Sequence, residues 1–133
     1  MQRIAVSILF GLALAALVSA KMTPEQVASL PPPASRPVSF AQDIKPIFEA
    51  SCIKCHGRGQ GKGGFRLDSR ETLLNGGDSG PAVVVGKSAE SYLIELVSGV
   101  DPDNVMPVKG SRLTREQVGL LREIGRASCR ERV

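Results

Sequence analysis

The chain of 133 residues contains no tryptophan, one tyrosine and one histidine, and aromatic residues make up only 4% of it. A chain of this length forms one domain at most. With so few aromatic side chains it buries only a modest core by itself, and this composition would suit a large apolar cofactor at its centre. Because there is a single histidine and only three cysteines, a zinc site with four protein ligands has few residues to draw on.

Two of the three cysteines and the only histidine stand together as Cys52, Cys55 and His56, in the order Cys-X-X-Cys-His. This spacing is typical of c-type haem attachment. Each thiol can form a thioether with one haem vinyl group, and the histidine then lies beneath the iron as its proximal ligand. A zinc site would need a second ligand pair, and a redox dithiol would need a strand and a helix of a βαβ unit, which the sequence does not show. The motif therefore predicts one covalently attached haem c.

Met106 is the only methionine well inside the predicted domain. A thioether is a soft ligand that suits haem iron, and histidine–methionine ligation raises the reduction potential. Pro107 follows and restricts the backbone of Met106 to an extended conformation. Since the chain has no second histidine, we favour Met106 as the distal iron ligand, with core packing or an open distal site as alternatives.

The first 38 residues are expected to lie outside the haem domain. Residues 1–20 combine a short positive start, an apolar run and small residues at the end, which is typical of a secretory signal peptide. An uncleaved membrane anchor is the alternative, although the apolar run hardly reaches the length of a spanning helix. Residues 21–38 contain a Pro-Pro-Pro run and are predicted to be an extended linker. The protein is thus expected to be periplasmic or otherwise exported.

The last ten residues, 124–133, resemble the translation of a common sequencing adapter, and we expect them not to be native, with the junction near Glu123. Cys129 then leaves the cysteine count, and the final helix is truncated. Residues 21–122 hold thirteen basic and eleven acidic residues, a net charge of +2. This small excess gives no reason to expect a nucleic-acid partner.

Between these ends, the pattern of apolar residues and capping residues predicts helices and loops only. A helix is expected from Ser39 into Cys52 with a kink at Pro46, a short one after Asp68 or Ser69, and a clearer one capped by Ser88. A last helix is expected after a capping box at Thr114. Residues 57–64 are predicted to be a loop because of their glycines. The fold class is therefore all-α.

Residues 40–122 resemble the planctomycete-type cytochrome c domain, a member of the class I c-type cytochromes. The stretches that carry the resemblance are DIKPIF at 43–48, CIKCH at 52–56, GGFRLDSR at 63–70, GGDSGP at 76–81 and the pair Met106-Pro107. The resemblance implies a class I cytochrome fold over residues 39–123, with Cys52 and Cys55 as haem attachments and His56 and Met106 as axial ligands. The sequence departs from the family at its end, where a tryptophan-containing continuation of the last helix is missing.

Three functions fit these features. The first is a one-electron carrier that exchanges electrons with redox partner proteins and is not itself an enzyme. The second is the amino-terminal haem domain of a longer exported enzyme, truncated here. The third is a haem-based sensor with an open distal site. Contact with a membrane is expected only through an uncleaved amino-terminal anchor.

Overall fold

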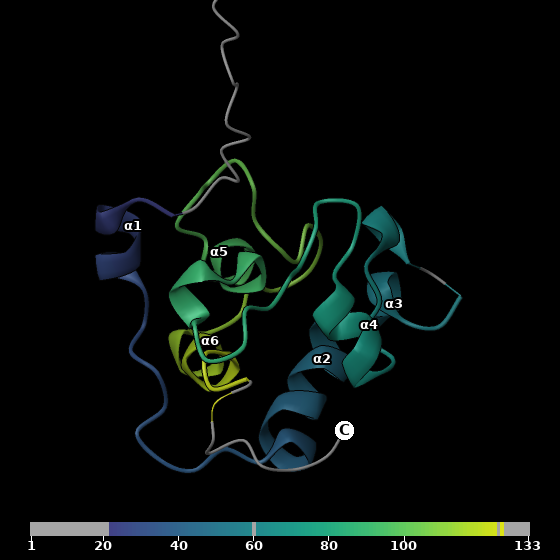
Figure 1. Ribbon diagram of the computed structural model, residues 1–133, viewed down its shortest axis with the longest axis horizontal. Coiled ribbons are helices and arrows are strands. Elements are labelled where there is room, and N and C mark those ends of the chain that lie inside the picture. Colours follow the sequence, from purple (N-terminus) through teal and green to yellow (C-terminus); the bar gives the residue numbers. More distant parts are fainter. Residues whose placement is uncertain (1–21, 60, 125, 127–133) are drawn as a thin grey trace, which may run out of the picture.

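The computed structural model describes residues 22–59, 61–124 and 126, and the regular elements in this part of the chain are helical (Figure 1). Its only β-type pairing is an isolated bridge between Gly77 and Gly80. The predicted all-α fold class is therefore confirmed. The predicted signal peptide at residues 1–20 and Cys129 lie outside the described residues.

The elements are short and follow one another closely along the chain. In order they are α1 (Pro24–Ser29), the π-helical turn η1 (Phe40–Ile44), α2 (Lys45–Ser51), α3 (Ile53–His56), the 3₁₀ turn η2 (Lys62–Gly64), α4 (Arg70–Asn75), the 3₁₀ turn η3 (Ser88–Glu90), α5 (Tyr92–Ser98) and α6 (Arg115–Leu121). None of the helices in the described residues is both long enough and apolar enough to be a membrane span.

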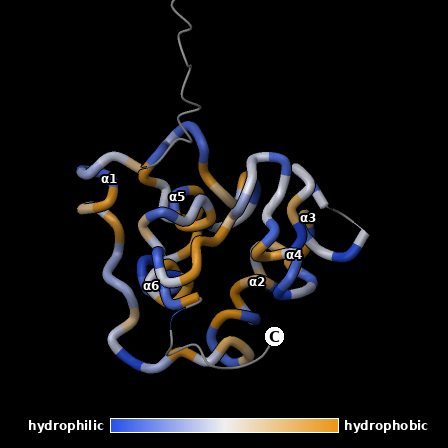
Figure 2. Tube along the Cα trace, viewed as in Figure 1, coloured by the Kyte–Doolittle hydropathy of each residue, from blue (hydrophilic) through white to orange (hydrophobic). Residues whose placement is uncertain are grey.

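The helices form two groups that meet through η1. On one side α3 packs against α2, and α2 continues from η1; on the other side α5 packs against α6, which also contacts η1. Figure 1 shows α2, α3 and α4 on the right of the molecule and α5 and α6 to their left. Hydrophobic stretches are concentrated on α2, α5 and α6 (Figure 2). The most completely buried side chains of the core are Ile44, Ile94, Val118 and Leu121.

The helix that leads to the cysteines begins and breaks where the sequence predicts. The Ser39 side chain accepts a hydrogen bond from the Gln42 amide at 3.2 Å, as a capping residue does. The regular α-helix α2 then starts at Lys45 and carries Pro46 in its first turn. Proline is tolerated there because a first-turn amide has no partner within the helix. The chain therefore changes its helical type just before Pro46.

The start of α5 differs from the prediction. We expected Ser88 to cap this helix, but Ser88 opens the 3₁₀ turn η3 and the residue before α5 is Ser91. The Ser91 hydroxyl is buried, accepts from the Val84 amide at 2.9 Å and donates to the Lys87 carbonyl at 3.1 Å. It therefore fastens the preceding loop and does not cap the helix. The residue after α5 is Gly99, which has the left-handed conformation that glycine adopts readily.

The amino-terminal segment departs from the extended linker that its prolines suggest. A capping box between Thr23 and Gln26 starts α1, and Met22 and Leu30 are buried in the core. Farther along, the Ala34 amide donates to the Gly119 carbonyl of α6 at 3.0 Å. Residues 22–38 therefore pack along the body of the domain.

Replacing Gly119 by alanine should loosen this packing. A Cβ atom at position 119 would lie 2.7 Å from the Pro32 carbonyl oxygen, which is backbone and cannot rotate away. We expect a loss of about 1–3 kcal/mol in the free energy of unfolding, measured by denaturant titration. Cleavage by a protease within residues 22–38 should also become faster. The variant Lys109→Ala, at an exposed loop position, is the control and should change neither quantity. Equal stability of Gly119→Ala and the native chain would contradict the prediction.

Candidate functional site

The Cys-X-X-Cys-His motif forms a single helical turn directly after α2. The Cys52 amide donates to the Phe48 carbonyl at 2.8 Å and so continues α2 into the motif. The amides of Cys55 and His56 then donate to the Cys52 carbonyl at 3.1 and 2.9 Å. These bonds define α3 and bring both cysteines and the histidine onto one short turn.

The imidazole of His56 is oriented by the residues that follow it. Its Nδ1 atom lies 3.2 Å from the carbonyl oxygen of Phe65, and the Phe65 ring meets it edge to face with 5.3 Å between ring centroids. A carbonyl can only accept, so this contact assigns the proton to Nδ1 and leaves the lone pair on Nε2. Among the described residues, no hydrogen-bond partner of Nε2 is present. The ring is thus prepared to bind a metal through Nε2.

The two thiols are free and half-buried. Burial raises the pKa of the Cys52 thiol to about 11, because it disfavours the thiolate. Cysteines of redox dithiols have lowered pKa values, so the environment of Cys52 is unlike theirs. The described residues also hold no group of three or more histidine, cysteine or acidic side chains that is placed to bind a metal ion.

Met106 is held beside α5 by its backbone. Its amide donates to the Leu96 carbonyl at 3.0 Å, and its half-buried side chain packs against the core. The bond between Met106 and Pro107 is cis. Figure 1 shows α3, which carries His56, and α5 as separate helices in the two groups. The structure therefore brings Cys52, Cys55 and His56 together on one turn, while the backbone of Met106 is attached to α5 through the Leu96 carbonyl.

The structure adds the backbone of residues 65–67 to the site. Besides the Phe65 carbonyl, the Leu67 amide contacts the motif and donates to the His56 carbonyl at 2.7 Å. The stretch GGFRLDSR predicts a glycine-rich turn and a helix start at Asp68 or Ser69, but no contact with the histidine. The glycines before Phe65 mark a turn that can return the chain to the histidine, yet a carbonyl contact leaves no signal of its own in the sequence.

A helical turn that carries two free thiols followed directly by a histidine has the residue order that is typical of haem attachment in c-type cytochromes. The comparison with known families agrees with this class. Residues 52–110 match the family described as Planctomycete cytochrome C. This match supports a planctomycete-type cytochrome c domain in residues 52–110. A domain of this type implies covalently bound haem c and suggests electron transfer. No curated protein and no solved structure matches the chain.

Proposed function

We propose that this protein is an exported cytochrome with one haem c that transfers single electrons between partner proteins. The observation that carries the proposal is the contact of 3.2 Å between His56 Nδ1 and the Phe65 carbonyl, which leaves Nε2 to bind iron on the same helical turn as two free thiols. This arrangement has the residue types that a haem needs, with a carbonyl acceptor at Nδ1 of the histidine. A bound haem would supply the reversible one-electron change of its iron.

Each site residue has a distinct role in this proposal. Cys52 and Cys55 would hold the porphyrin by thioether bonds, and His56 would bind the iron through Nε2. Met106 would be the second axial ligand. Its half-buried side chain packs against the same core as Cys52, which supports this role. The hydrogen bond from the Met106 amide to Leu96 would keep the thioether in place.

The other residues of the domain would form the environment of the haem. The protein contributes burial, orientation of the ligands and a face for docking, while the redox chemistry belongs to the cofactor. Removal of residues 1–20 after export would release the protein outside the cytoplasmic membrane. Its partners would be other redox proteins, without a role for nucleic acid.

The proposal is tested on the full chain, matured in a host that attaches haem c. We expect a coloured protein whose pigment stays with the polypeptide in acidified acetone. Its absorbance in a redox titration should follow a single one-electron transition. Its reduced form should be low-spin and should not bind carbon monoxide. A colourless product would overturn the proposal, and a high-spin reduced form that binds carbon monoxide would replace the electron carrier by a haem-based sensor.

A further inference from the structure

Residues 65–67 touch His56 at three points. The Phe65 carbonyl accepts from Nδ1, the Phe65 ring meets the imidazole edge to face, and the Leu67 amide donates to the His56 carbonyl. The imidazole and the backbone of His56 are therefore both fixed by the same short segment. A shift of this segment would change the hydrogen bond to Nδ1 directly.

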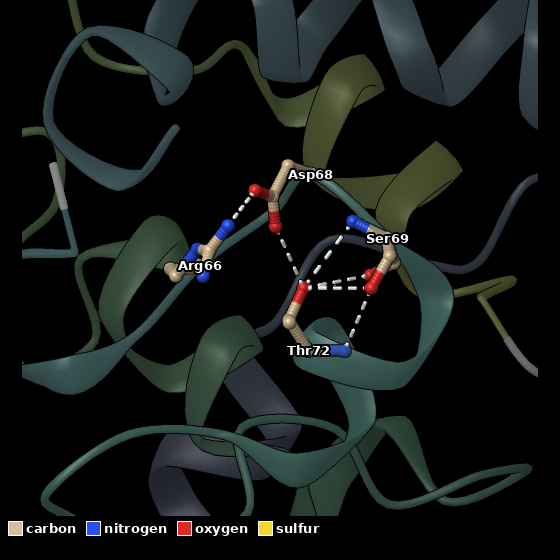
Figure 3. Close-up of polar contacts among 4 residues, drawn as sticks. All are labelled: Arg66, Asp68, Ser69 and Thr72. Carbon is tan, nitrogen blue, oxygen red and sulfur yellow. Dashed lines mark hydrogen bonds and ion pairs between the residues drawn. The ribbon is translucent and has the colours of Figure 1, made fainter. Parts of the chain in front are cut away.

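Downstream, this segment is fastened to the start of α4 by a polar network (Figure 3). The Asp68 carboxylate forms an ion pair with Arg66 and accepts a hydrogen bond from the Thr72 hydroxyl at 3.1 Å. Thr72 and Ser69 complete a capping box, with amide-to-hydroxyl distances of 3.2 and 3.1 Å. The Asp68 side chain is only 13% exposed. One carboxylate thus joins the residue next to Phe65 to the first turn of α4.

On its amino-terminal side, at Gly63, the segment packs against the turn formed by Gly77 and Gly80. The Asp78 amide donates to the Gly63 carbonyl at 2.7 Å. A Cβ atom at Gly77 would lie 2.4 Å from that carbonyl oxygen and 2.9 Å from the Phe65 nitrogen. Only glycine allows the two backbones to approach this closely. Phe65 is therefore supported from both directions along the chain.

We propose that Asp68 and Thr72, together with the Gly77 turn, are positioning residues that hold the Phe65 carbonyl on Nδ1 of His56 and thereby tune the reduction potential of the haem iron. The inference rests on the proposed ligation of haem by His56. It assigns a role to residues of the GGFRLDSR and GGDSGP stretches.

The direction of the effect follows from the hydrogen bond. An Nδ1–H group that donates to a carbonyl makes the imidazole more basic and a stronger ligand. A stronger donor stabilises ferric iron more than ferrous iron, which lowers the reduction potential. Loosening the Phe65 carbonyl should therefore raise the potential. Loss of Met106 should lower it, so the two effects have opposite signs.

The test compares three variants of the matured full-length protein. Thr72→Val keeps the shape of the side chain but removes the hydroxyl, and Thr72→Ser restores the hydroxyl. Thr114→Ala removes the capping box of α6, far from the motif in the chain, and is the control for a purely structural loss. For each protein, the midpoint potential is measured by spectroelectrochemical titration, and the ferric low-spin state is measured by electron paramagnetic resonance. The melting temperature is measured as well.

We expect Thr72→Val to raise the potential and shift the low-spin g values, Thr72→Ser to return both to the native values, and Thr114→Ala to lower only the melting temperature. A Thr72→Val protein with a lower melting temperature but a native potential and spectrum would overturn the inference alone. If Thr72→Val does not acquire haem, the variant Asp68→Asn replaces it in the test. This variant removes the charge that faces Arg66, and the same outcomes support or overturn the inference. A native chain without covalent haem would overturn the proposed function as well.

Discussion

Replacement of both Cys52 and Cys55 by serine is expected to abolish covalent attachment of the haem. Serine keeps the size of the side chain but cannot form a thioether, so no bond would join the porphyrin to α3. Pigment should then be extracted completely into acidified acetone, and the denatured polypeptide should lose its haem stain on a gel. The native chain should keep both the pigment and the stain.

Cys129 provides the matched control for this experiment. The variant Cys129→Ser also exchanges one thiol for a hydroxyl, but at a position that the sequence places in the non-native tail. It should retain all of its covalent haem. Pigment that stays bound to the Cys52 and Cys55 double variant in acid would show that the haem is held elsewhere, and the assignment of the motif would then be wrong.

The variant Met106→Ala is expected to lower the reduction potential and to change the spin state of the iron. Without the thioether the iron would lose its soft axial ligand, and the ferric form would become relatively more stable. Different axial ligands set haem potentials over a range of about 0.8 V, so the shift should be far larger than the error of a titration. The reduced variant should also become high-spin and bind carbon monoxide.

Met22 gives the comparison that separates ligation from packing. It is another methionine in contact with the core and is buried. The variant Met22→Ala should lower the free energy of unfolding by about 2–5 kcal/mol, as truncation of a buried methionine does, and leave the potential and the spin state unchanged. An unchanged potential in Met106→Ala would remove Met106 from the set of ligands.

Features encoded by a few neighbouring residues were predictable from the sequence. The cap at Ser39, the break at Pro46, the left-handed glycine at Gly99 and the capping box at Thr114 all depend on contacts within one or two turns. The start of α5 was missed because Ser88 and Ser91 are both good capping residues. Which of them precedes the helix is decided by the burial of the Ser91 hydroxyl against the 82–87 loop.

The packing of residues 22–38 could not be read from composition. The prolines favour an extended chain, and a capping box around Thr23 is the only local sign of a helix. The contact that fixes the segment is made with Gly119, which is distant in sequence. In the site, the three side chains of the motif were visible in the sequence, while the Phe65 carbonyl was not, since every residue has one. The distal role of Met106 stays a prediction.

The close packing of residues 22–38 against the domain limits how the predicted signal peptide at residues 1–20 could be removed. Only Lys21 separates the predicted cleavage point after Ala20 from the buried Met22. A signal peptidase would therefore have to cut at the very edge of the folded body, most easily before α1 has docked. A protein that kept its signal peptide would be held close to the bilayer, because almost no linker would separate the peptide from the domain. Its rotation toward partner proteins would then be restricted. In the proposed role as an electron carrier, release from the membrane would thus decide how far the protein can diffuse between partners.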